Sequence, residues 1–236
     1  MAAKGKTASK NAARNSGARG NRPPHRMPPP VAVSRPKPWG LIAAVVAVVL
    51  FAGGVIGYAV LQVRDKAADT PQARATAAAK IDGVTVKSYP SGQHKQTPIK
   101  YDQSPPFGGP HDPQWADCTG TVYSKAIRNE NAVHSLEHGA IWVTYRPGLS
   151  STEVDALRRR VDGVDYMLMS PYPGLKTKVS LQAWGHQLFV DSVDDKRIDT
   201  FVTDLRHNTA SAPEPSASCV NPEFKANPKT PDNPAS

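Results

Sequence analysis

Cysteine is scarce in this chain of 236 residues, and the two that are present, Cys118 and Cys219, lie far apart. Without a C-x-x-C pair, neither has the setting of a catalytic thiol. The chain also lacks a G-x-S-x-G nucleophile motif, a P-loop and a dinucleotide-binding fingerprint. Its composition excludes collagen, a coiled coil and a polytopic membrane protein. We therefore have no signature that requires an enzyme, and we do not expect one.

Acidic residues are absent from residues 1–38, which hold nine lysines and arginines. Those nine account for the whole excess of 29 Lys+Arg over 20 Asp+Glu, so the net charge of +9 belongs to this tail and the remainder is formally neutral. A basic chain first suggests a nucleic-acid partner, but this placement removes the need for one. The tail has few large apolar residues, and we expect it to be disordered. It should face anionic inner-leaflet lipids.

Charge of either sign is absent from residues 39–61. As a helix, residues 40–61 would span about 33 Å, enough for a bilayer core of about 30 Å. A buried core helix rarely has such a long uncharged run, and a cleaved signal peptide would have a shorter apolar region and a shorter basic region. Basic flanks stay in the cytoplasm. The pattern predicts a single-pass protein of the cell membrane, with its N-terminus cytoplasmic and its C-terminal part outside.

Composition divides the outer part into three segments. Residues 62–81 are polar and Ala-rich and read as a stalk. Residues 82–208 have the apolar periodicity of one folded domain. Residues 209–236 contain six prolines and few apolar groups, and we expect a disordered extension. An even number of cysteines in an oxidising compartment predicts a Cys118–Cys219 disulfide; two free thiols are the alternative.

The periodicity of residues 82–208 predicts a compact α+β domain with a small antiparallel or mixed sheet and helices on one face. A ferredoxin-like topology is one way to connect these elements. Residues 98–118 have too many turn formers for an element, and Ser150 with Glu153 forms a capping box at a helix start. The expected strands cover residues 84–89, 140–145, 165–169, 178–184 and 187–190, and the expected helices run to about 161 and over about 195–206.

The strongest candidate for a functional site is the segment His134-Ser-Leu-Glu137-His138-Gly139. Two histidines four residues apart share one face of a helix or of a strand, and either arrangement presents two imidazoles to one metal ion. The same residues fit H-x-x-E-H, a zinc-peptidase signature in which the Glu is the general base. That match is short, and it needs a third protein ligand downstream.

Three further side chains extend the candidate metal set. His111 lies in a loop rich in Pro and Gly, and Met167 and Met169 alternate so that both thioethers share one strand face. Thioethers together with imidazoles favour copper, especially Cu(I). The alternative is structural: methionines on strands are often core filler, and the histidines would then be only polar core groups. His186 reads as structural, and His94 and His207 read as exposed.

Four segments together resemble a known family: PPFGGPH at 105–111, HSLEHGAIWVTYRPGL at 134–149, MSPYPGL at 169–175 and QAWGH at 182–186. They are similar to an uncharacterised family that is common in actinobacteria, domain-of-unknown-function family 3105. The likeness covers about residues 80–208. It implies an exported domain tethered by one N-terminal span, and no established reaction. The signature positions it implies are His111, His134, Glu137, His138 and Met169.

The sequence thus leads to one main hypothesis and two alternatives. The main one is a membrane-anchored envelope protein whose outer domain binds a transition metal, with copper favoured and zinc the alternative. Its ligands would be His111, His134, His138, Met169 and Met167, with Glu137 orienting an imidazole from the second shell. The first alternative is a non-catalytic module that docks an envelope protein, and the second is the zinc peptidase.

Overall fold

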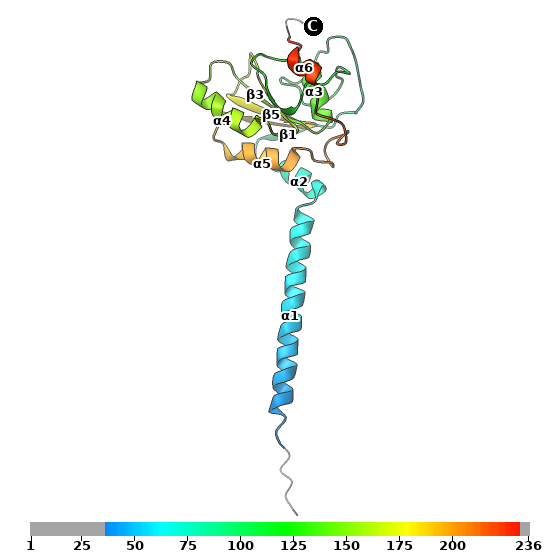
Figure 1. Cartoon of the computed structure of the whole chain (residues 1–236), viewed down its shortest axis with the longest axis vertical. Coiled ribbons are helices and arrows are strands. Elements are labelled where there is room, and N and C mark those ends of the chain that lie inside the picture. The colour runs from blue at the N-terminus through cyan, green and yellow to red at the C-terminus, as the bar shows by residue number, and fades with distance from the viewer. Residues whose placement is uncertain (1–35, 232–236) are drawn as a thin grey trace, which may run out of the picture. The chain divides into compact units, whose positions relative to one another are not determined.

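A computed structural model describes residues 36–231 of the chain. Its first element, α1 (Trp39–Ala68), is long and apolar enough over Trp39–Arg64 to cross a membrane, and its apolar side chains are exposed (Figure 1). This helix contains the expected span and continues into the segment expected to be a stalk. The prediction of a disordered tail over residues 1–38 lies almost wholly outside the described residues.

The second helix, α2 (Pro71–Ala78), belongs to the domain and not to a stalk. Thr70 caps it, Pro71 occupies its first turn, and Ala78 is fully buried in the core. The side chain of Asn208 donates to the Pro71 carbonyl at 2.9 Å and so fastens the helix beside α5 (Lys196–Leu205). The small alanine side chains permit this close approach, which residue composition alone does not reveal.

The centre of the domain is a six-stranded mixed sheet in the order β1-β6-β5-β3-β4-β2. Strand β4 runs parallel to both of its neighbours, β3 and β2, and the other pairs are antiparallel. The α+β class is confirmed, although the order differs from a four-stranded ferredoxin-like sheet. The strands are β1 (Val84–Val86), β2 (Thr119–Val122), β3 (Ile141–Tyr145), β4 (Met167–Pro171), β5 (Val179–Ala183) and β6 (His186–Val190).

One face of the sheet is covered by α2, α5 and α4 (Ser151–Val161). The capping box of Ser150 and Glu153 opens α4 as expected. Alternate residues of β3 and β4 point to this face, because successive strand side chains alternate. They include Ile141 and Val143 with Met167 and Met169, all essentially inaccessible to solvent.

The opposite face carries a second core, built around Trp142 and Leu168. It is covered by α3 (Asn129–Glu137), the long loop that precedes β2, and α6 (Pro222–Ala226). Figure 1 shows α3 and α6 together on the side of the sheet away from α4 and α5. Helices therefore lie on both faces. The loop over residues 98–118 has no regular element, as its turn formers predict.

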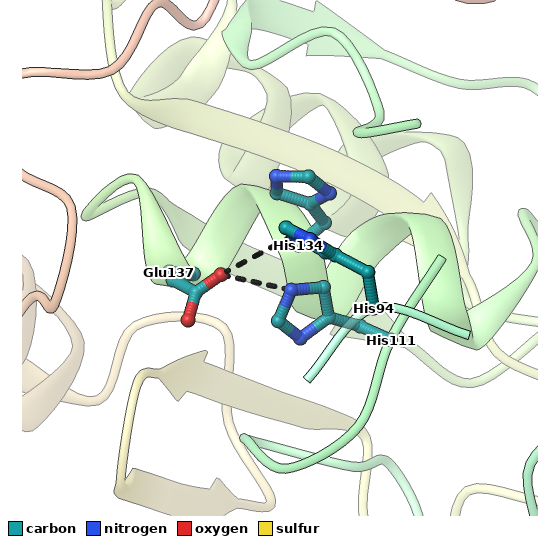
Figure 2. Close-up of side chains that lie close together, drawn as sticks. All are labelled: His94, His111, His134 and Glu137. Atoms are coloured by element: carbon teal, nitrogen blue, oxygen red, sulfur yellow. Dashed lines mark ion pairs between the residues drawn. The ribbon is translucent and has the colours of Figure 1, made fainter. Parts of the chain in front are cut away.

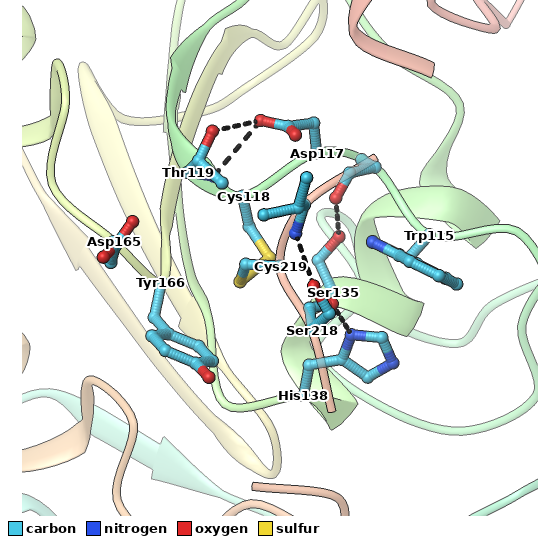
Figure 3. The surroundings of a disulfide bond; sticks show 12 residues. Trp115, Asp117, Cys118, Thr119, Ser135, His138, Asp165, Tyr166, Ser218 and Cys219 are labelled. Atoms are coloured by element: carbon cyan, nitrogen blue, oxygen red, sulfur yellow. Dashed lines mark hydrogen bonds between the residues drawn. A yellow bond between two sulfur atoms is a disulfide. The ribbon is translucent and has the colours of Figure 1, made fainter. Parts of the chain in front are cut away.

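The prediction of a disordered extension over residues 209–236 is wrong for residues 209–231. Cys219 and Phe224 are buried in the second core, and the Asn221 amide donates to Asp117 at 2.8 Å. The Cys118–Cys219 disulfide is present, as predicted (Figure 3). The expectation of disorder was wrong because prolines exclude long helices and strands but do not prevent a segment from packing. Pro222 occupies the first turn of the short α6.

Candidate metal centre

The H-x-x-E-H pattern consists of His134, Glu137 and His138. It lies on the C-terminal half of α3, beside the second core. His134 and Glu137 are one turn apart, and His138 caps the helix before Gly139 takes a left-handed conformation with φ of +95°. The Gly139 amide donates to the carbonyl of Leu136 at 2.9 Å, which ends the helix as the sequence predicts. All three side chains are buried.

The loop before β2 brings two more histidines over α3. His94 and His111 pair as a parallel bridge, in which Lys95 donates to the His111 carbonyl and His111 donates to the Gln93 carbonyl. Gly108 permits the loop to pass against Tyr89, since a Cβ there would lie 2.3 Å from the Tyr89 ring. The glycines of the PPFGGPH segment therefore position the His111 imidazole.

Four side chains converge between this loop and α3: His94, His111, His134 and Glu137 (Figure 2). Their candidate ligand atoms all lie within 4.8 Å of one another. Donors around one ion are separated by at most about 4.2 Å, twice a bond of about 2.1 Å. Only a small inward rotation is needed to close the group on an ion.

The Glu137 carboxylate is the centre of this group. Its Oε2 lies 2.8 Å from Nε2 of His111 and 3.9 Å from Nε2 of His94. Its Oε1 accepts the Gly92 amide at 2.6 Å. His111 and Glu137 are fully buried, whereas the His94 side chain is 41 % exposed. The group therefore lies just beneath the surface, with His94 at its rim.

Backbone carbonyls set the tautomer of three histidines. Nδ1 of His111, His134 and His138 lies 2.8, 2.7 and 2.8 Å from the carbonyls of Gly109, Asp112 and Ser218, respectively. A carbonyl can only accept, so each Nδ1 carries the proton. In the neutral imidazole, Nε2 is then left with its lone pair. Metal-binding histidines are held in this way in other proteins: the ring nitrogen that does not bind the metal donates its proton to a carbonyl or carboxylate.

The protonation states also suit a metal ion. Burial lowers the pKa of His134 to about 4 and also lowers that of His138. Burial acts to raise the pKa of Glu137, but the neighbouring His111 and the Gly92 amide outweigh it and hold this pKa below its usual value. At neutral pH His134 and His138 are thus neutral imidazoles beside the ionised carboxylate of Glu137, the forms that bind metals.

One contact in the group has two physical explanations, an ion pair and a metal site. Nε2 of His111 and Oε2 of Glu137 are buried and 2.8 Å apart, yet neither makes a hydrogen bond. An imidazolium form of His111 would make this contact an ion pair with the carboxylate. In the neutral tautomer two lone pairs face each other, and they repel unless a cation lies between them or beside them. Buried polar atoms without partners are rare in native structures, and an ion is one recognised reason for them.

A second donor group adjoins the first and shares His134 with it. It consists of His134, His138 and Glu214, whose candidate ligand atoms also lie within 4.8 Å of one another. The His134 ring is 4.8 Å from that of His111 and 4.7 Å from that of His138. Four of the seven histidines in the chain therefore form one continuous series.

Met167 and Met169 were predicted as ligands, and the structure places them elsewhere. Both belong to the core beneath α4 and α5, on the face of β4 opposite to Leu168 and α3. The alternation of the strand correctly put them on one face, but nothing local to the strand says which face the histidines occupy. The thioether argument for Cu(I) therefore does not hold.

Other predicted roles also change. Glu137 was expected in the second shell, but its carboxylate lies within the donor group itself. His94 was expected to be exposed, but it belongs to the donor group. The small number of histidines in the chain was the one feature of the sequence that pointed to it. Glu214 lies in the segment over 209–236 that was expected to be disordered, and it belongs to the second donor group. A peptidase would need Glu137 to face an open cleft, whereas it is fully buried with Oε1 bonded to Gly92.

A surface cavity of about 930 Å³ lies away from these histidines. Its lining includes Tyr145, Leu149, Pro171 and Tyr172, and none of the residues of either donor group. The cavity and the donor groups are therefore separate features of the domain.

Comparison with known proteins finds one family. The model of a family described as "Protein of unknown function (DUF3105)" matches residues 93–221, more than half of the chain. The matched segment contains both donor groups and both cysteines. No curated protein and no solved structure matches the chain.

Proposed function

Because the chain belongs to the DUF3105 family, whose description names no activity, we propose a function from the donor group itself: the domain binds one divalent transition-metal ion. The ligands are His94, His111, His134 and Glu137. Three neutral imidazoles and one carboxylate leave a divalent ion with a single net positive charge, which suits a buried position better than two would.

The observation that carries this proposal is the buried contact between Nε2 of His111 and Oε2 of Glu137. Both atoms lack a hydrogen-bond partner, and both point into a group of further donors. A metal ion at this position would bind both lone pairs at once. The carbonyl bonds to Nδ1 of His111 and His134 already hold the rings in the required tautomer.

The donor types favour copper as Cu(II), with zinc as the alternative. Imidazole nitrogens suit both ions, and without thioethers nothing selects Cu(I). For a given set of nitrogen and oxygen donors, Cu(II) binds more tightly than Zn(II). Storage, delivery and sensing of the metal are all consistent with a buried site that has one ligand at its rim.

Titration of the full-length chain in detergent micelles tests the proposal. We expect one equivalent of Cu(II), and more weakly one of Zn(II), to bind the wild type. His111→Gln should weaken both affinities at least about tenfold, since even an outer hydrogen-bond partner of a ligand is worth that much. Isothermal titration against a competing chelator would measure the constants.

The matched control is His186→Gln. His186 resembles His111 in that its Nδ1 lies near the carbonyl two residues earlier, that of Trp184, at 3.0 Å. It belongs to neither donor group. Wild-type affinity is expected for this variant. Equal and weak binding by wild type and His111→Gln would rule out the metal function.

We also propose the location of the domain: the cell membrane, with α1 as a single span, the N-terminus in the cytoplasm and the metal-binding domain outside. The charge-free run and the basic residues that precede it support this orientation. The membrane, through its anionic inner leaflet, is then the partner of residues 1–38. An envelope protein that exchanges the metal is the partner proposed for the outer domain.

A reporter that folds only in an oxidising compartment, fused after Ser236, tests this location. Activity is expected from intact cells that make the fusion, and thiol labelling without reductant should reach neither cysteine. A reporter that is active only in the cytoplasm would reverse the proposed orientation without affecting the metal titration.

A further inference from the structure

The two donor groups share a single nitrogen. Nδ1 of His134 is committed to the Asp112 carbonyl at 2.7 Å, so its Nε2 alone is available to an ion. An ion in the inner group, with His111 and Glu137, and an ion in the outer group, with His138 and Glu214, would both need this atom. The two positions are therefore alternatives for one ion, and not sites for two.

Each position has one ligand at the surface. In the inner group His111, His134 and Glu137 are buried, and the His94 side chain is 41 % exposed. In the outer group the Glu214 side chain is 44 % exposed, and its Oε2 lies 4.0 Å from Nε2 of His138. The outer group therefore connects the solvent to the buried one through a chain of protein ligands.

The outer group is a built feature of the fold. The Glu214 amide donates to the Glu137 carbonyl at 2.9 Å, which fixes residue 214 at the end of α3. The Ser218 carbonyl orients the His138 ring, and the disulfide at the next residue fastens that carbonyl (Figure 3). Two independent anchors thus hold the two outer donors beside His134.

Charge favours entry at this end over entry at His94. A hydrated cation is drawn to an exposed carboxylate such as Glu214. The other exposed ligand, His94, is a histidine followed directly by the exposed cation Lys95. Ions approaching the domain should therefore meet Glu214 first.

We propose that the outer group is the entry and exit position of the metal, and that His134 passes the ion between the two positions; this rests on the proposed metal function. During transfer the bond from His134 Nε2 to the ion persists. The bonds to Glu214 and His138 break as bonds to His111 and Glu137 form, and the oxidation state does not change. Ligand exchange about one retained nitrogen avoids releasing a bare ion into the interior.

The test compares equilibrium with rate in the full-length chain in detergent micelles. Cu(II) is mixed rapidly with the protein, and the fluorescence of Trp115, whose ring is 5.2 Å from that of His138, follows loading. Excess EDTA then measures unloading. In Glu214→Gln we expect both rates to fall at least about tenfold, the lower end of what a focusing charge contributes to association. The dissociation constant should stay within about threefold, because the inner ligands are intact.

Glu223→Gln is the matched control, since Glu223 is an exposed glutamate of the same C-terminal segment outside both groups. It should load and unload like the wild type. Wild-type rates in Glu214→Gln would contradict the proposed entry position and favour entry at His94. If the variant still bound one equivalent, the proposed metal function would be unaffected. A large loss of equilibrium affinity in Glu214→Gln would also contradict the proposal, because it would make Glu214 a permanent ligand.

Discussion

Replacing Cys118 and Cys219 together with alanine is expected to lower the free energy of unfolding by about 4 kcal/mol. The bridge joins residues 101 apart in sequence and encloses α3, α4, α5 and five of the six strands. In the chain-entropy account, closing a loop of about 100 residues raises the free energy of the unfolded chain by about 4.7 kcal/mol, because it lowers the conformational entropy of that chain. The native state loses little stabilising free energy, because alanine is small enough to occupy the buried positions of the two cysteines.

Thermal unfolding followed by near-ultraviolet circular dichroism would measure this effect. For a domain of this size, about 4 kcal/mol corresponds to a fall in Tm of about 8–16 °C. The wild type and the double variant should give the same native spectrum, because the contribution lies mainly in the unfolded state. A fall of less than about 3 °C would show that the C-terminal segment is held by its packing and hydrogen bonds alone.

The second large effect is expected from Glu137→Gln, which should weaken metal binding by about 4 kcal/mol, close to a thousandfold. The change preserves size and removes only the negative charge. An ion among three imidazoles would then keep both of its positive charges in a buried position, and uncompensated buried charge is costly.

The same substitution should not lower the Tm of the metal-free protein. A glutamine oxygen can still accept the Gly92 amide, and its NH₂ group can donate to the unprotonated Nε2 of His111. A marked loss of stability in the metal-free variant would mean that the carboxylate serves as a structural ion pair and not as a ligand.

Glu130→Gln gives the opposite pattern and is the control. Glu130 is a buried glutamate on the same helix, where its carboxylate pairs with Arg128 at 3.2 Å and accepts the Ile99 amide at 2.9 Å. Breaking that pair should lower the Tm. Metal affinity should be unchanged, since Glu130 lies in neither donor group.

Local signals predicted much of the fold. The capping box fixed the start of α4, Asp195 caps α5 as its position suggested, and strands β3, β5 and β6 lie within about a residue of their expected bounds. Strand β2 was missed, because it has four residues and contains Gly120 at an irregularity in its pairing with β4. Such a strand is defined by its neighbour and not by its own side chains.

The candidate site was predictable only in part. His134 and His138 were found because helical spacing is local, and His111 was found because its glycine-rich loop is unusual. Assigning Met169 failed because alternation gives relative orientation along one strand, whereas the choice of face depends on which helix covers it. His94 and Glu214 reach the site through a loop bridge and a disulfide-anchored segment, which are contacts between distant parts of the chain.

The position of the segment from Glu214 to Phe224 imposes an order on the maturation of the protein. Ribosomes deliver this segment after the inner donors, so the second core, the disulfide and the outer donor group are completed only after residue 224 has been made. The inner donors come from residues 94–137 and are synthesised much earlier. Metal captured before residue 214 is made would thus meet the inner ligands directly, and the proposed entry position would exist only once the disulfide-anchored segment is in place.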